Sequence, residues 1–165
     1  MAINHFIYIT NDENSGDPEG AGSEGSDWIF LVCEDFTDTF NNENTRTSTA
    51  GHTIFEIKLE KIDQSVTLQK CYLIYLGDDG TSNSTSEYYN RVKRFLGNSC
   101  KSGGDTLYLM VYKPITDTNA TWVRWMDGDG DWQNYLKVRI GGFSFKFNAQ
   151  KRCFVGSISL EEVTT

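Results

Sequence analysis

The sequence predicts a single, mainly antiparallel β domain, folded as a sandwich or a barrel, with one short flanking α-helix. Aromatic residues make up 13% of the chain, a share that favours sheets over a helical bundle. Apolar or alternating runs recur between turns rich in Gly, Asp and Asn, and one segment has helical spacing. At 165 residues the chain has the usual size of one domain, so we expect a single domain over residues 1–165.

The first two predicted strands are separated by an acidic segment. His5–Thr10 is a short β-branched and aromatic run that predicts a strand. Residues from about 11 to 27 are rich in Gly, Ser, Asp and Glu and lack large apolar side chains, so we expect a long exposed loop there. From Asp27 to Cys33 the chain is almost continuously apolar, which is typical of a strand covered on both faces.

The clearest strand signal lies in the middle of the chain. Residues 52–62 alternate strictly between apolar and polar side chains, the period of a half-buried strand. The stretch before them, residues 37–51, is polar and predicts a connecting segment. We expect a separate partner strand over residues 65–76, after a break at Asp63–Gln64.

One helix is predicted, from about Ser84 to Leu96. Ser84 and Glu87 have the spacing of a capping box, and Gly97 can close the helix. The apolar stripe consists of Tyr88, Tyr89, Val92, Phe95 and Leu96. The basic residues away from that stripe are expected on a solvated face or in ion pairs; they are Arg91, Lys93 and Arg94.

The remainder of the chain is predicted to be sheet. A strand from Asp105 ends at Pro114, and an Asp-Gly turn at residues 127–131 joins two further strands. Gly141–Gly142 indicates a bend, and a last hairpin turns at residues 149–151. On that hairpin, Phe143, Phe145 and Phe147 are expected on the face opposite Ser144 and Lys146.

Two motifs suggest ligands, and each has a plainer interpretation. Asp127, Asp129 and Asp131 could surround a calcium ion, but Trp132 and Val138 stand where an EF-hand loop needs Gly and a bidentate acid. We therefore favour a hairpin turn and expect no metal or other cofactor.

The tryptophans nearby could form a platform for a sugar; because Trp122 and Trp125 would face opposite sides of a regular strand, at least one is expected in the core.

The sequence lacks an evident catalytic apparatus. Only His5 and His52 could serve as a catalytic histidine, and the sequence contains no G-x-S-x-G nucleophile elbow, so we expect no enzyme activity. Glu34 and Asp35 are the candidates for a pair of catalytic acids, with solvation as the simpler interpretation.

The net charge of -8 disfavours general binding to nucleic acid or anionic lipid. Apolar runs are too short to span a bilayer, and we expect no membrane anchor.

The cysteines are widely spaced and form no zinc motif. Three of them fall in apolar strand segments, where a free cysteine behaves as a small buried hydrophobe. Reduced thiols are the expectation and disulfides the alternative for Cys33, Cys71, Cys100 and Cys153.

The order of features resembles the tube fold of phage tails and type VI secretion systems. The closing segment YLKVRIGGFSFKFNAQKRCFVGSISLEEV resembles the end of phage tail-tube proteins, with a strand, a bend, a hairpin and a final strand. The alternating strand HTIFEIKLEK and the helix STSEYYNRVKRFLG between β blocks are similar to that fold as well. The resemblance spans about Asp27 to Val163.

The resemblance implies a non-enzymatic structural subunit of a virion tail or contractile injection system, made in the host cytoplasm. Copies would form a homo-oligomeric ring or stacked rings, contact other tail or baseplate proteins, and surround an acidic lumen through which DNA or an effector passes as cargo. One long loop, at residues 11–26 or 37–51, would reach the neighbouring ring. The residues expected at the subunit interface are Phe55, Glu56, Lys58, Glu60, Phe143 and Phe145. The alternative is a carbohydrate-binding β-sandwich module, assisted by calcium at the three aspartates.

Overall fold

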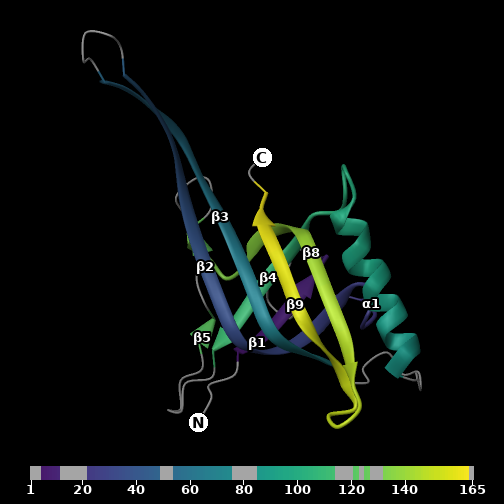
Figure 1. The fold of residues 1–165 in the computed structure, drawn as a ribbon. Helices are drawn as coiled ribbons and strands as arrows, with labels where there is room; N and C mark the ends of the chain where they lie inside the picture. Colours follow the sequence, from purple (N-terminus) through teal and green to yellow (C-terminus); the bar gives the residue numbers. More distant parts are fainter. Residues whose placement is uncertain are drawn as a thin grey trace.

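The computed structural model describes residues 5–11, 22–48, 54–75, 85–113, 121–122, 125–126 and 132–163 (Figure 1). It is mainly β with one helix, as the sequence predicts. In chain order the elements are β1 (His5–Thr10), β2 (Trp28–Ser48), β3 (Ile54–Ile74), α1 (Thr85–Cys100), β4 (Leu107–Lys113), β5 (Thr121–Trp122), β6 (Trp125–Met126), β7 (Trp132–Gln133), β8 (Leu136–Asn148) and β9 (Cys153–Glu162).

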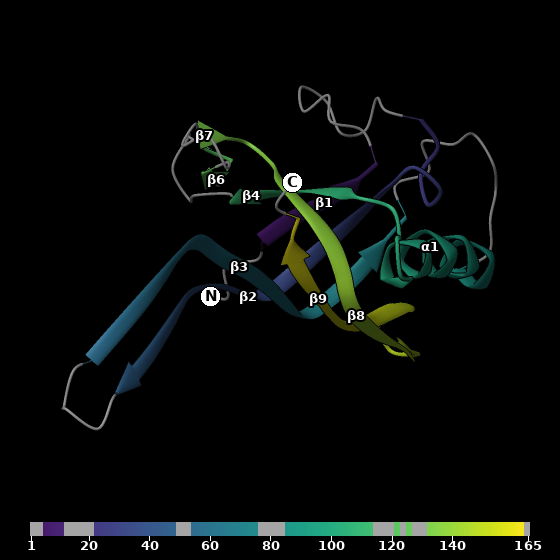
Figure 2. The same cartoon turned by 90° about the horizontal axis from the view of Figure 1, so that it is seen from above.

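Six of the strands close into an antiparallel barrel (Figures 1 and 2). The strand order is β1-β2-β3-β9-β8-β4, and β1 pairs with β4 to complete the circle. The short strand β5 continues along β4, while β6 and β7 form a separate two-stranded sheet. Of the two predicted arrangements, the barrel is therefore correct.

The barrel encloses the apolar core. Alternating residues of the strands point inward and are almost completely buried, as the two-residue period of a strand requires. The inward set is Ile7, Ile9, Ile29, Leu31, Cys33, Val66, Leu68, Cys71, Leu73, Leu107, Leu109, Val111, Leu136, Val138, Ile140, Ile158 and Leu160. On β2 the other face is covered as well, because Trp28 and Phe30 are buried too. This confirms the prediction of a strand covered on both faces.

Helix α1 lies against the β8–β9 hairpin (Figure 2). The predicted apolar stripe is its packing face, with Tyr88, Val92 and Leu96 buried. The helix continues past Gly97 to Cys100, four residues beyond the predicted last residue, Leu96. Ser99 explains the extension: its buried hydroxyl donates to the Asp105 carbonyl at 2.7 Å and accepts from the Ile140 amide at 3.1 Å. Ser84 of the predicted capping box lies outside the described residues.

Bulges set which side chains face the helix. The pairing of β8 with β9 shifts between Ile140 and Gly142, where the sequence predicts a bend. The extra residue of the bulge shifts the alternation of the strand by one, so that residues which would otherwise point outward point inward. Even-numbered residues up to Ile140 therefore point inward, and beyond the bulge the odd-numbered Phe143 and Phe145 do so, as expected, with Ser144 and Lys146 exposed outside.

The central hairpin differs from the prediction. The polar residues expected to connect two strands are themselves in β2, which continues to Ser48. The expected break at Asp63–Gln64 is also wrong, because β3 is one strand from Ile54 to Ile74. The polar half of β2 pairs with the alternating half of β3 from Thr39↔Ser65 to Ser48↔Ile54. Backbone pairing along β3 therefore holds a segment whose composition alone favours a loop.

The described ends of the acidic segment are held by hydrogen bonds, and part of them is buried. The Asn11 amide donates to the Asp27 carbonyl at 2.9 Å, and the Ser23 amide donates to Asp27 Oδ2 at 2.8 Å. Glu24 is buried and forms an isolated bridge with Trp28. The prediction of an exposed loop is confirmed for Asn11, Gly22, Ser23 and Ser26 and is wrong for the buried Glu24 and Gly25; residues 12–21 lie outside the described part of the chain.

The expectation of four reduced cysteines is corrected for two of them. Cys33 and Cys71 are register partners on β2 and β3, their Cα atoms 4.1 Å apart, and they form a disulfide inside the barrel. The adjacent strands bring them together although 38 residues separate them in sequence. Cys100 and Cys153 are free thiols. Burial raises the pKa of both.

Candidate functional site

A long two-stranded arm extends from the barrel (Figures 1 and 2). We define the arm as residues 39–48 of β2 and 54–64 of β3. β1 pairs with β2 only as far as Cys33, and β9 pairs with β3 only from Ser65 onward. The arm strands thus pair with each other and leave the barrel sheet, over about 30 Å at the usual rise of a strand. Because a closed barrel has few free edges, the edges of the arm are prominent places for another chain to pair.

The base of the arm is held by a polar contact. Gln64 Nε2 donates to Asp38 Oδ1 at 3.0 Å, and Gln64 is buried. Burial raises the pKa of the Asp38 carboxyl above its ordinary value, although the hydrogen bond from Gln64 acts in the opposite direction. This contact links the two strands where β3 leaves β9.

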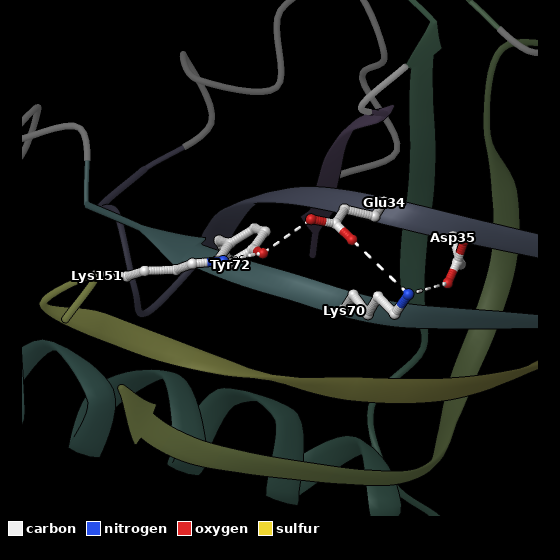
Figure 3. A network of polar contacts seen from close by, with 5 residues as sticks. All are labelled: Glu34, Asp35, Lys70, Tyr72 and Lys151. Carbon is white, nitrogen blue, oxygen red and sulfur yellow. Dashed lines mark hydrogen bonds and ion pairs between the residues drawn. The ribbon is translucent and has the colours of Figure 1, made fainter. Parts of the chain in front are cut away.

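A polar network covers the barrel wall next to the Cys33–Cys71 pair (Figure 3). Lys151, in the turn between β8 and β9, donates to the Tyr72 hydroxyl, which donates to Glu34 Oε1 at 2.9 Å. Lys70 lies between the two neighbouring acids, 4.0 Å from Glu34 Oε2 and 3.6 Å from Asp35 Oδ2. The network joins β2 and β3 to the β8–β9 turn.

The network fixes side-chain positions more than it adds stability. Its ion pairs are well exposed, with Lys70 at 65% and Asp35 at 52% exposure, and such pairs contribute little free energy. The hydrogen bond to Tyr72 raises the pKa of the Lys151 ammonium, aided by the Glu34 charge. Glu34 and Asp35, the candidates for paired catalytic acids, thus share Lys70 as an ion-pair partner.

Sequence reasoning missed most of this network. Lys70 has a φ of 52°, which is uncommon for a residue other than glycine, and it lies in the bulge where β3 shifts register against β9. Neither bulge nor register can be derived from the local pattern. The available signal was the pair of acids on one strand and a lysine on the next, which becomes informative only when those strands are known to pair.

The expected interface residues lie in two separate places. Phe55, Glu56 and Lys58 pair with Thr47, Arg46 and Asn44 along the arm. Glu60 is on the same strand, and the side chains of all four expected arm residues lie outside what the structure describes. Phe143 and Phe145 are half-buried against the core. The ring centroids of Phe145 and Tyr89 of the helix are 6.1 Å apart. Farther along β8, Phe147 is 47% exposed.

The candidate ligand sites gain no described geometry. Asp127, Asp129 and Asp131 lie outside the described residues. The residues that the structure describes contain no cluster of acids, histidines or cysteines suited to a metal. The flanking hairpin is present, with Trp125↔Gln133 and Met126↔Trp132 paired. Trp122 and Trp125 belong to different sheets rather than one strand, and Trp125 is buried as expected of at least one of them.

One larger cleft lies beside the helix. It has a volume of about 780 Å³ and is lined by Asn11, Ser26, Arg91, Arg94, Phe95, Asn98, Asp105, Thr106 and Leu107. The Arg91 guanidinium lies 5.8 Å from the centre of the Tyr88 ring, so this basic residue is partly engaged by the helix itself. Lys93 and Arg94 are exposed, as expected of a solvated face.

No model of a known protein family matches the chain, and no curated protein is significantly similar to it. Among the described residues, α1 is too short and too polar to cross a bilayer, so no membrane-spanning helix is found. The function must therefore be argued from the fold and its surfaces.

Proposed function

We propose that this chain is a non-enzymatic structural subunit that assembles with copies of itself into a ring or stacked rings, as in a phage tail or a contractile injection system. The observation that carries the proposal is the long arm of β2 and β3, which extends from a closed β-barrel with one flanking helix. DNA or an effector would be cargo, and other tail or baseplate proteins would be partners in the virion.

The arm supports the proposal because an isolated two-stranded ribbon is marginally stable on its own. An arm of this length is consistent with a second molecule stabilising it by pairing or packing. Its β3 strand alternates apolar and polar residues in sequence. When a partner covers an apolar face on a ribbon outside the core, the burial of that face is favourable. The expected residues Phe55, Glu56, Lys58 and Glu60 belong to this strand.

The closed barrel constrains how copies would join. In the described barrel the backbone edges of β1, β2 and β9 are mostly occupied by neighbours. Sheet pairing between copies would therefore use the arm or the distal part of β8, beyond its pairing with β4 at residues 136–138. Phe143 and Phe145 would act by supporting the helix at this edge, since they pack inward.

A shortened arm tests the proposal. In the variant, an Asn-Gly turn replaces residues 43–61 and connects the register partners Asn42 and Ile62. We expect the full chain to elute as a large species with rings or tubes in negative-stain micrographs, and the variant to elute as a monomer. Circular dichroism and thermal unfolding check that the barrel of the variant remains folded.

Two outcomes would contradict the proposal. One is a full chain that remains monomeric at high concentration, and the other is a folded variant that still assembles. In the carbohydrate-binding alternative a sugar platform would exclude Trp125, which is buried, and would rely on Trp122 or Trp132, whose side chains lie outside what the structure describes. A glycan-induced rise in melting temperature of a monomeric chain would favour that alternative.

A further inference from the structure

A shallow polar groove lies on the outer wall of the barrel, away from the helix and the arm. It has a volume of about 460 Å³ and is formed by neighbouring strands β3, β9 and β8. Its lining residues are Gln69, Lys70, Ser144, Lys146, Val155, Gly156 and Ser157. None of them is acidic, although the chain as a whole carries a charge of -8.

The groove is shaped by two backbone irregularities. Gly156 lies in the middle of β9, and a Cβ added there would overlap the Ser144 carbonyl oxygen and come within 2.8 Å of the Phe145 Cα. The missing side chain lets β8 and β9 approach closely. On the other side, the bulge of β3 next to Gly156 carries Gln69 and Lys70, both of which are exposed.

The polar groups in the groove are available to a ligand. Within the described residues, the side chains of Gln69, Ser144, Lys146 and Ser157 make no hydrogen bond or ion pair. Lys70 is engaged by Asp35 and Glu34, which stand outside the lining. Lys146 therefore supplies an ammonium group without an ion-pair partner to a groove that is also lined by two hydroxyl groups and an amide, all of which can donate hydrogen bonds.

We propose that this groove binds a carboxylate side chain presented by an acidic, extended segment of a protein partner. Ammonium and hydroxyl donors that line one groove, with no acid among the lining residues, complement a carboxylate, and charge-assisted hydrogen bonds are the stronger kind. The net charge of -8 opposes any long polyanion, which favours a short segment that brings few carboxylates to the groove over a nucleic acid backbone. The inference does not rest on the proposed assembly, because the groove lies on a face formed by β3, β9 and β8, whereas pairing between copies would use the arm or the free edge of β8.

The test titrates the full-length chain with tetraglutamate at low salt, using isothermal calorimetry and the amide NMR signals of Gly156 and Ser157. We expect saturable binding that weakens as salt is added. Lys146→Ala should lower the affinity about fivefold or more. The matched control is Lys137→Ala, which removes the same charge from an exposed position of β8 outside the groove and should leave the affinity within about twofold.

The titration separates the groove from simple charge attraction. Ser157→Ala should weaken binding while leaving the net charge unchanged. Absence of binding, equal losses in the two lysine variants, or signals that move elsewhere on the molecule would overturn the proposal. So would tighter binding of a single-stranded oligonucleotide than of tetraglutamate. The shortened-arm variant retains every groove residue, so repeating the titration on that monomer distinguishes failure here from failure of assembly.

Discussion

Tyr89 of helix α1 stacks on Phe154 of β9, with ring centroids 3.9 Å apart and ring planes inclined by only 11°. The same tyrosine meets Phe145 edge-on, so one helical side chain touches both strands of the last hairpin. Burial at this contact raises the pKa of the Tyr89 hydroxyl. The helix is thereby attached to a hairpin that extends beyond the pairing of β8 with β4.

We predict that Tyr89→Ala lowers the free energy of unfolding by about 2 kcal/mol, because an aromatic contact and its buried area are lost. Tyr89→Phe keeps the ring and should remain within about 0.5 kcal/mol of the wild type. Urea denaturation measures both. A double-mutant cycle with Phe154→Ala should give a coupling of about 1 kcal/mol, and a coupling near zero would show that the stacking contributes nothing.

A pair of glycine variants tests the close approach of β8 and β9. Gly156→Ala should destabilise the protein by about 1–3 kcal/mol, because the new Cβ meets the backbone of Ser144 and Phe145. Gly97→Ala is the matched control: it lies in the helix with nothing within 4 Å of the added Cβ, and should stabilise by about 0.5–1 kcal/mol. Thermal unfolding distinguishes them, and equal effects of the two variants would refute the account of Gly156.

Ser99 connects the end of the helix to the sheet. Ser99→Ala should destabilise by about 1–3 kcal/mol, since the buried Ile140 amide would lose its acceptor. Ser102→Ala, at an exposed position just after the helix, should change stability by less than about 0.5 kcal/mol. Hydrogen exchange at the Ile140 amide offers a local readout, and unchanged protection in Ser99→Ala would contradict this role.

The raised pKa of Asp38 predicts a dependence of stability on pH. A carboxyl whose pKa is raised on folding binds its proton more tightly in the folded state. Its contribution is therefore complete below the ordinary value of 3.8 and is lost as the pH rises through the higher, folded-state pKa. Asp38→Asn keeps an acceptor for Gln64 but does not ionise, so its stability relative to wild type should increase between pH 3 and pH 7.

Chemical denaturation of wild type and Asp38→Asn at the two pH values measures this difference. The effect should be small, because Asp38 is exposed and solvent screens its charge. Asp35→Asn provides the comparison, as Asp35 is exposed and ion-paired with Lys70. If the stability of Asp38→Asn relative to wild type decreases from pH 3 to pH 7, the predicted direction of the pH dependence is wrong.

Local pattern predicted the elements well where one residue period dominated. The apolar run of β2, the stripe of α1 and the phenylalanines of β8 all follow from the sequence, since periods of 2 and 3.6 residues decide which faces can be buried. The arm was missed because its β2 strand is polar, and only pairing with β3 makes it a strand. The helix stop was missed because Ser99 is held by residues far along the chain.

The site depended even more on contacts distant in sequence. Phe143 and Phe145 could be assigned a common face, but not a helix packed against that face. Gly156 within a strand was a usable signal of close backbone approach, whereas the convergence of Lys146 with Gln69 required the strand order.

What the sequence alone determined is the β character, the single helix and the faces of the longest strands, because these depend on neighbours a few residues away. The tertiary structure decided that the sheet closes into a barrel, that Cys33 meets Cys71, and that one hairpin extends beyond the core. Register and closure arise from pairing between distant segments, and their free energy depends on all the strands together rather than on any one of them.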